Sequence, residues 1–182
     1  MRNASRFAIL AIAAALAVAL PAAAGAAGSD TAALHASAEL RNATGDVVGW
    51  ARFTEDAAGI LHVNAQVRGL PEGLHGIHIH AVGACAPTFA AAGGHHNPLG
   101  VGHGLDSDAG GHAGDLPNLS VNVAGAGHLD ATSDRATLSA GTLSVFDGDG
   151  SALVIHAGQD DQHTDPTGNS GGRIACGVIV AD

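Results

Sequence analysis

Short stretches in which apolar and polar residues alternate recur along most of the chain. The clearest alternation covers residues 60–67, Ile-Leu-His-Val-Asn-Ala-Gln-Val, as expected for a half-buried β-strand whose successive side chains point to opposite faces. Similar strands are predicted over residues 36–40, 47–53, 77–82, 119–124, 136–138, 142–146, 152–156 and 174–180. No stretch has the period of a long amphipathic helix. Many short strands separated by turn residues predict an all-β, antiparallel sandwich or barrel.

Two segments of the chain do not fit this strand pattern. Residues 83–116 and 158–173 are rich in Gly, His, Pro and Asp, and most of the histidines lie in them or beside them. Loops of this length are uncommon in a compact domain and are usually functional. We therefore expect the chemistry of the protein to lie in these two loops and in the strands next to them.

The first 24 residues have the pattern of a secretory signal peptide. Arg2 and Arg6 precede an uninterrupted apolar run over residues 7–20, and small residues come next over 21–25. This is the order of the charged, apolar and cleavage regions in such signals. The alternative is a membrane anchor, but the run is shorter than the roughly 20 residues that cross a bilayer. The pattern predicts that residues 1–24 are removed and that the protein is periplasmic or secreted.

Length and composition restrict the organisation of the chain after the signal. A chain of 182 residues suggests one domain, so we expect a flexible N-terminal segment over 25–35 and a single domain over 36–182. With 17 acidic and 7 basic residues, the formal net charge is -10, which leaves no basic surface for nucleic acid. We also expect no membrane contact after signal cleavage. Cys85 and Cys176 form an even pair, which in an exported protein favours a disulfide over two buried free thiols.

Several histidines have positions that suit metal binding. His78 and His80 stand two residues apart in a predicted strand, so both imidazoles point to the same face and can share one ion. Alone, this signal is weak. His156 ends another predicted strand, and a histidine there is more often structural than a ligand. We interpret His75, at the end of a turn, as a structural histidine and His96 as a loop residue. Trp50 and Phe53, two of the few large aromatic residues, are expected in the core.

A stronger group lies in the first glycine-rich segment. Three imidazoles and one carboxylate fall within 21 positions, at His95, His103, His112 and Asp115. Such a set suits a four-coordinate Zn(II) site, and a flexible loop has to fold around the ion to bring the ligands together. The alternative is a polar surface loop with scattered histidines. Turn residues beside these histidines, such as Gly93-Gly94 and Asn97-Pro98, argue against that alternative.

Four motifs spread over this chain resemble those of copper/zinc superoxide dismutase. They are Gly76-Ile-His-Ile-His80, Gly93-Gly-His-His-Asn-Pro98, His112-Ala-Gly-Asp-Leu116 and Gly168-Asn-Ser-Gly-Gly-Arg-Ile-Ala-Cys-Gly-Val-Ile179. Any one of them could arise by chance, but all four in the family's order are specific. The resemblance implies an eight-stranded antiparallel Greek-key barrel or sandwich with two long functional loops.

The resemblance also assigns ligands and roles. The implied copper ligands are His78, His80, His95 and His156. The implied zinc ligands are His95, which bridges the two metals, and His103, His112 and Asp115. Asp160 matches a carboxylate that links the outer nitrogens of His78 and His103. Arg173 matches the arginine beside copper that attracts the substrate, and Cys85 and Cys176 match the family disulfide.

The function implied by this family is the conversion of superoxide to oxygen and hydrogen peroxide. Copper cycles between Cu(II) and Cu(I), zinc is structural, and Arg173 and His95 are the implied catalytic residues. The alternative is a protein that binds copper and zinc in the cell envelope without dismutase activity. The short segment between Asp161 and Thr167 lacks the Glu and Lys cluster that many eukaryotic members use to steer superoxide. Bacterial members occur as monomers and as homodimers, and both states remain open for this chain.

Overall fold

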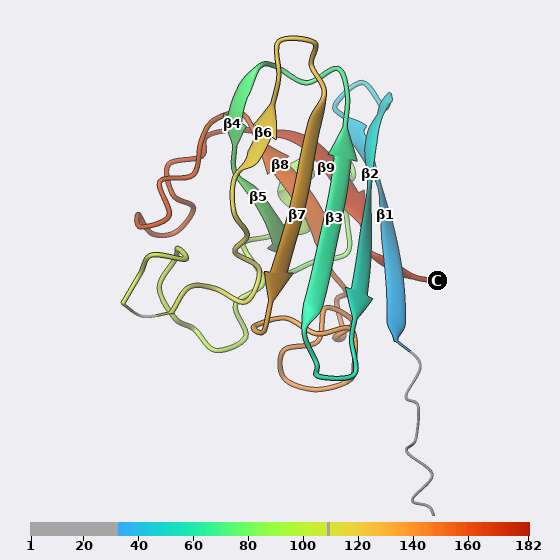
Figure 1. Cartoon of the computed structure of the whole chain (residues 1–182), viewed down its shortest axis with the longest axis vertical. Coiled ribbons are helices and arrows are strands. Elements are labelled where there is room, and N and C mark those ends of the chain that lie inside the picture. The colour runs from blue at the N-terminus through green and yellow to red at the C-terminus, as the bar shows by residue number, and fades with distance from the viewer. Residues whose placement is uncertain (1–32, 109) are drawn as a thin grey trace, which may run out of the picture.

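The chain folds into a strongly curved antiparallel sheet (Figure 1). The computed structural model describes residues 33–108 and 110–182. Within these residues there are ten strands and one short 3₁₀ helix, η1. Their bounds are β1 Leu34–Asn42, β2 Val47–Glu55, β3 Leu61–Val67, β4 Gly73–His75, β5 Ile77–His80, η1 Phe89–Ala92, β6 Leu119–Val121, β7 Gly127–Ser133, β8 Ala152–His156, β9 Arg173–Val178 and β10 Val180–Ala181. In this part of the chain, no helix is both long enough and apolar enough to cross a membrane. The predicted signal lies outside it.

The two edges of the sheet meet at one residue, Gly76. The strands have the order β4-β6-β7-β3-β2-β1-β9-β8-β5, with β10 also paired to β1. The edge strands β4 and β5 are consecutive in the chain and are separated only by Gly76. The Gly76 N–H donates to Gly158 O (2.8 Å), and the Gly76 carbonyl accepts from His156 N (2.8 Å). If β4 and β5 are counted as one strand, and β9 and β10 as another, the nearly closed barrel has the eight strands that the family resemblance implied.

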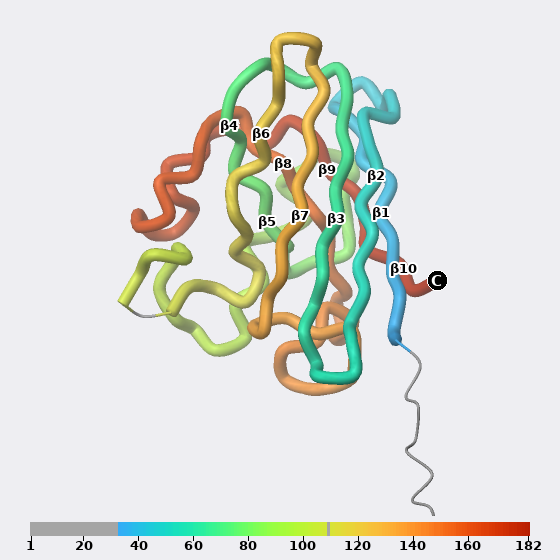
Figure 2. Tube along the Cα trace, viewed as in Figure 1, coloured from blue at the N-terminus to red at the C-terminus, as the bar shows by residue number. Residues whose placement is uncertain are grey.

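With β4 and β5 counted as one strand, two connections cross from one part of the barrel to another. The chain passes from β3 to β4 and from β7 to β8 between strands that are not neighbours, so that β3 pairs with β7 and β1 pairs with β9. This is a Greek-key arrangement. The first long loop (residues 81–118) and the second long loop (residues 157–172) project from the same side of the barrel (Figure 2). They are joined by a hydrogen bond of 3.1 Å from Leu105 N to Gln162 Oε1.

The alternation of apolar and polar residues determines which side chains form the core. In β3 the side chains of Leu61, Val63, Ala65 and Val67 are buried, while His62 and Gln66 are exposed. Each residue of β3 pairs with β2 on one side and with β7 on the other. The strand predicted over residues 60–67 is therefore confirmed, and its apolar face packs inside the barrel.

Two of the predicted strands are wrong. Residues 136–138 and 142–146 belong to the connection between β7 and β8, where Thr137 N donates to Leu143 O (2.9 Å) and Val145 N donates to Thr137 O (2.9 Å). Their apolar side chains, such as Leu138 and Val145, are buried in the core cluster. These residues are apolar because the connection packs against the core, and not because they pair in the sheet.

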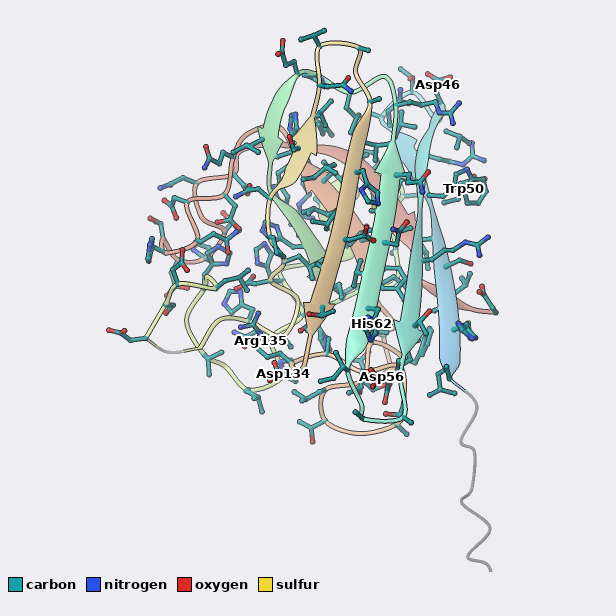
Figure 3. All side chains as sticks on the ribbon, in the orientation of Figure 1. Asp46, Trp50, Asp56, His62, Asp134 and Arg135 are labelled. Carbon is teal, nitrogen blue, oxygen red and sulfur yellow. A yellow bond between two sulfur atoms is a disulfide. The ribbon has the colours of Figure 1, made fainter. Side chains whose placement is uncertain are left out.

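The structure also contains two strands that were not predicted, the short β4 and the longer β7, and an aromatic residue outside its expected place. All seven residues of β7 pair with β3, although its sequence Gly-His-Leu-Asp-Ala-Thr-Ser has one large apolar residue, Leu129. Phe53 is buried, as expected, but 56% of Trp50 is exposed on the outer face of β2, where Figure 3 shows it near the rim of the molecule. Trp50 is at an outward position of the strand, so the alternation overrides the apolar character of its side chain.

The expected disulfide forms between Cys85 and Cys176. It connects the start of the first long loop to β9 across 91 positions of sequence. Because β9 begins at Arg173, this covalent bond keeps the loop next to the strand that carries that arginine.

Glu55 organises the connection between β7 and β8. Its buried carboxylate accepts hydrogen bonds from Leu138 N (2.5 Å), Ser139 N (2.7 Å) and Ser139 Oγ (2.7 Å). Burial by itself raises the pKa of Glu55, but the hydrogen bonds from Ser139 and Leu138 outweigh it and leave the pKa below its usual value. The ionised form is therefore the one that stabilises the fold, and this stabilisation is lost as the pH falls through the folded-state pKa.

We expect Glu55→Gln to lower the free energy of unfolding at neutral pH by about 1–3 kcal/mol, because two backbone N–H groups lose a charged acceptor. The difference between wild type and variant should shrink as the pH falls below the pKa of Glu55, measured by urea unfolding of both proteins in the same metal state. The control is Glu39→Gln, a more exposed carboxylate on β1, which should cost less than about 0.5 kcal/mol. An equal loss at all pH values would contradict this role of Glu55.

Candidate metal centre

The strand β5 turns two histidines away from the core. Ile77 and Ile79 belong to the apolar core cluster, so His78 and His80 project from the opposite face, as the two-residue period of a strand requires. His156 lies at the end of β8, the strand that pairs with β5. The two long loops fold over this outer face, which is why all three histidines are buried although they point out of the barrel.

The four predicted copper ligands lie together. One imidazole nitrogen from each of them falls within 4.8 Å of the others, in the group His78, His80, His95 and His156. The Nε2 atoms of His80 and His156 are 3.4 Å apart, and the ring centroids of His78 and His95 are 4.0 Å apart. Imidazole nitrogen is a ligand that suits copper, so the donor set fits this metal.

The four predicted zinc ligands form a second group that shares one residue with the first. Its members are His95, His103, His112 and Asp115. His95 Nδ1 lies 2.9 Å from Asp115 Oδ1 and 3.2 Å from His112 Nδ1. Neighbouring ligand atoms around a tetrahedral zinc ion are about 3.3 Å apart when the bonds are about 2.0–2.1 Å. These distances therefore match the edges of such a polyhedron.

Three buried imidazole nitrogens have no hydrogen-bond partner in the part of the chain that the structure describes. They are His78 Nδ1, His95 Nε2 and His103 Nδ1, the last of which lies 3.0 Å from Asp115 Oδ1 without the alignment of a hydrogen bond. A buried polar atom without a partner costs free energy, and each of these atoms belongs to one of the two groups and is free to face an ion. Copper and zinc would remove this cost, so the residues present fit both metals.

The copper group consists of His78, His80, His95 and His156. In each of these histidines except His95, the ring nitrogen that points away from the copper site has a hydrogen-bond acceptor. His78 Nε2 lies 2.6 Å from Asp160 Oδ2, while His80 Nδ1 and His156 Nδ1 donate to the carbonyls of Gly93 (3.0 Å) and Gly171 (3.1 Å). These contacts determine which nitrogen carries the proton and which one is left for a metal.

Asp160, which belongs to neither ligand group, bonds to one histidine of the copper group and one histidine of the zinc group. Its Oδ1 lies 3.0 Å from His103 Nε2, while its Oδ2 is the partner of His78. The carboxylate is itself held in place, because Gln162 N donates to Oδ1 (2.6 Å) and Asp160 N donates to Asn118 Oδ1 (2.8 Å). The link between His78 and His103 that the resemblance implied is therefore present in this structure.

The copper group is uncharged at neutral pH. Burial lowers the pKa of His78 to about 4, of His80 to about 2 and of His156 to about 4, and the hydrogen bonds of these rings offset only part of this effect. Burial likewise lowers the pKa of His95, against the influence of Asp115. Neutral imidazole is the form that binds a metal ion, so these ligands need not lose a bound proton first.

The zinc group is charged, in contrast. Burial alone would lower the pKa of His103, but the carboxylates of Asp115, 3.0 Å from Nδ1, and of Asp160, 3.0 Å from Nε2, outweigh it and raise the value to about 9. Burial raises the pKa of Asp115, yet hydrogen bonds with three histidines hold it well below its usual range. The group thus keeps an ionised carboxylate, which is a suitable ligand for zinc and offsets part of the charge of a divalent cation.

Arg173 lies beside the copper group. Its Nη1 and Nη2 donate to the carbonyls of Phe89 and Gly93, each at 2.5 Å. The Gly93 carbonyl also accepts from His80 Nδ1, so the guanidinium and a copper ligand share one acceptor. Burial lowers the pKa of Arg173, but a guanidinium stays charged at neutral pH.

The structure thus brings together every ligand expected from the sequence. His75 is structural, as predicted: its Nδ1 lies 2.8 Å from His156 O and its Nε2 lies 2.9 Å from Pro71 O. His96 is in a loop, as predicted, and it is buried. The backbone carbonyls that orient the ligands were missed, because any residue type supplies a carbonyl and a sequence gives no sign of its position.

Comparison with known proteins agrees with this geometry. A family model described as copper/zinc superoxide dismutase (SODC) matches residues 47–179. The chain is 45% identical over 149 residues to superoxide dismutase [Cu-Zn] 2 of Aquifex aeolicus, with 80% of this chain and 86% of that protein covered. It is 40% identical over 157 residues to superoxide dismutase [Cu-Zn] of Deinococcus radiodurans, with 79% and 83% covered.

A solved structure has the same fold. The crystal structure of a superoxide dismutase-like protein from Bacillus subtilis superposes with a TM-score of 0.75 at 38% identity, over 79% of this chain and 97% of the other. The region that matches the family model contains every ligand of both groups. The chain therefore belongs to the copper/zinc superoxide dismutase family, and it is an oxidoreductase that converts superoxide with bound copper and zinc.

Proposed function

We propose that this dismutase acts in the cell envelope or outside the cell. In its catalytic site, Arg173 attracts the superoxide anion to the copper group, and His95 holds and releases a proton. The observation that carries the catalytic part is that Arg173 and the copper ligand His80 bond to the same carbonyl, of Gly93. A fixed positive charge is therefore held next to the place where a small anion has to react.

The reaction converts two superoxide anions and two protons into one oxygen molecule and one hydrogen peroxide molecule. When bound, copper supplies the one-electron change between Cu(II) and Cu(I) that both halves of this reaction need. His95 offers Nε2 to the copper group and Nδ1 to the zinc group. Since Asp115 and His112 surround Nδ1, the ring keeps its place, and Nε2 is the atom suited to hold and release a proton.

Local charge matters more than the field of the whole molecule. The formal net charge of -10 opposes the approach of an anion from a distance. Arg173 acts at short range, where its guanidinium is already oriented by two carbonyls and needs no rearrangement when superoxide arrives. We infer that this residue provides most of the attraction for the substrate.

Export is supported by two features of the chain. Residues 1–24 have the order of regions found in a secretory signal. The bond between Cys85 and Cys176 is of a kind that persists in oxidising compartments and is rare in the cytosol. Together they favour a periplasmic or secreted enzyme that protects the cell envelope from superoxide.

We expect the purified enzyme to contain about one copper and one zinc per chain, since each ligand group suits one ion. His156→Ala should lose copper and dismutase activity while zinc stays bound, because His156 belongs only to the copper group. Metal analysis and a superoxide-consumption assay measure both. The control is His128→Ala, which changes an exposed histidine on the outer face of β7. Full metal loading without superoxide consumption would favour the alternative, a metal-binding protein without dismutase activity.

We expect Arg173→Glu to lower kcat/KM for superoxide by roughly 10-fold or more, because it replaces a local attraction by a repulsion. Added salt should slow the wild type, in which screening of the attraction by Arg173 outweighs screening of the net negative charge, and it should speed up the variant, in which both interactions are repulsive. Stopped-flow kinetics at several ionic strengths, with copper content checked, measure both effects. Arg52→Glu, on the outer face of β2, is the matched control. An unchanged rate for Arg173→Glu would disprove its role.

The mass of the mature protein tests export. When the full chain is produced in a bacterium with a secretion system, the recovered protein should lack residues 1–24 and should appear outside the cytoplasm. Intact-mass measurement and cell fractionation give the answer. Recovery of the uncut chain in the membrane fraction would instead indicate the anchor.

A further inference from the structure

Arg135 connects the end of the barrel to the first long loop. It lies two positions after β7, and its backbone N–H donates to Ser133 Oγ (3.1 Å). Its Nη1 donates to the carbonyl of Gly110 at 2.8 Å. Gly110 stands two residues before the zinc ligand His112. Figure 3 shows Arg135 pointing from the barrel toward this loop.

Burying part of the Arg135 side chain costs free energy, which a residue with only a packing role would avoid. Its Nε is buried without a hydrogen-bond partner in the described part of the chain. A buried donor without an acceptor destabilises the fold, and such a group calls for a physical explanation. An apolar side chain of similar size would avoid the cost, so the bond to Gly110 is the feature that distinguishes arginine at this position.

The backbone that Arg135 contacts needs an external anchor. Gly110 and Gly111 have positive φ angles of 90° and 76°, and glycine populates many such conformations in a free chain. A Cβ atom at Gly111 would lie 2.8 Å from Gly104 O, so the tight packing of the loop requires a glycine there. The loop therefore places two residues of high conformational freedom next to a metal ligand that has to be held in place.

The two ends of the segment between the zinc ligands His103 and His112 are anchored differently. At the first end, His103 N donates to Asp165 Oδ1 (2.6 Å) and Leu105 N donates to Gln162 Oε1 (3.1 Å), and both acceptors belong to the second long loop. At the second end, Arg135 holds the Gly110 carbonyl from the barrel. The backbone at His103 is thus held by the second long loop, whereas the backbone just before His112 is held by Arg135 from the connection after β7.

We propose that Arg135 is a positioning residue for zinc, which holds the Gly110 carbonyl so that His112 is oriented for the ion before the ion binds. Ordering the loop in advance lowers the entropy that zinc binding has to overcome. Groups that orient metal ligands from outside typically change metal affinity by about 10- to 100-fold when removed. The proposal concerns zinc alone, because the bond of Arg135 to Gly110 lies beside His112, which belongs only to the zinc group.

The test compares zinc affinity in Arg135→Leu, Arg135→Lys and Arg52→Leu. Arg52→Leu removes the same charge from the exposed face of β2, so it controls for net charge. Competition between the copper-free protein and a chromogenic chelator gives the zinc dissociation constant. We expect Arg135→Leu to weaken zinc binding by about 10- to 100-fold and Arg135→Lys, which keeps a donor, to weaken it less. Arg52→Leu should stay within about twofold.

A second measurement separates positioning from general stability. Thermal unfolding is recorded for the metal-free and the zinc-loaded forms of each variant. The rise in Tm caused by zinc should be smaller in Arg135→Leu than in wild type, and copper binding to the zinc-free protein should remain within about twofold. If Arg135→Leu lowers both Tm values equally and leaves zinc affinity unchanged, the proposal is overturned. If Arg135→Leu does not fold, the same comparison with Arg135→Lys decides.

Discussion

Gly76 is the position on which both the fold and the metal centre depend. It joins the two edges of the sheet, and its neighbours leave no room for a side chain. A Cβ atom there would lie 2.8 Å from the Cβ of Ser170, 3.0 Å from His78 Cε1 and 3.3 Å from the Cβ of Asp160. The barrel therefore closes at the point where a copper ligand, the carboxylate that orients it and the second long loop come together. Any shift of this junction would move all three.

The centre divides into two halves of different electrostatic character that share His95. On the copper side, burial keeps the imidazoles neutral, with backbone carbonyls and Asp160 selecting the nitrogen that faces the ion. On the zinc side, Asp115 remains ionised inside a group of histidines. The uncharged imidazoles of the copper side would let bound copper exchange an electron with an anionic substrate. Asp115 would balance part of the charge of bound zinc, which would stiffen the loop, so each half suits the metal assigned to it.

Most of the ligands lie on loops, and the structure holds these loops from several directions. The disulfide attaches the first long loop to β9, Arg173 bonds to two of its carbonyls, and Arg135 holds it from the end of β7. Hydrogen bonds from the second long loop secure the segment near His103. Rigid attachment compensates for a sequence that is rich in glycine, in which conformational freedom would otherwise oppose the assembly of a metal site.

The sequence by itself identified the metal ligands, through motifs that resemble those of a known family, and it showed which strands have an apolar face. Residue type dictates metal chemistry, and the two-residue period of β3 and β5 dictates which side chains point inward. Only the tertiary structure decided that β7, with little apolar character, pairs with β3. It also decided that the apolar residues 136–146 form a packed connection instead of strands. The carbonyls of Gly93, Gly110 and Gly171 acquired their roles in the same way. A backbone acceptor has no signature in sequence, and burial by a distant segment depends on the whole fold.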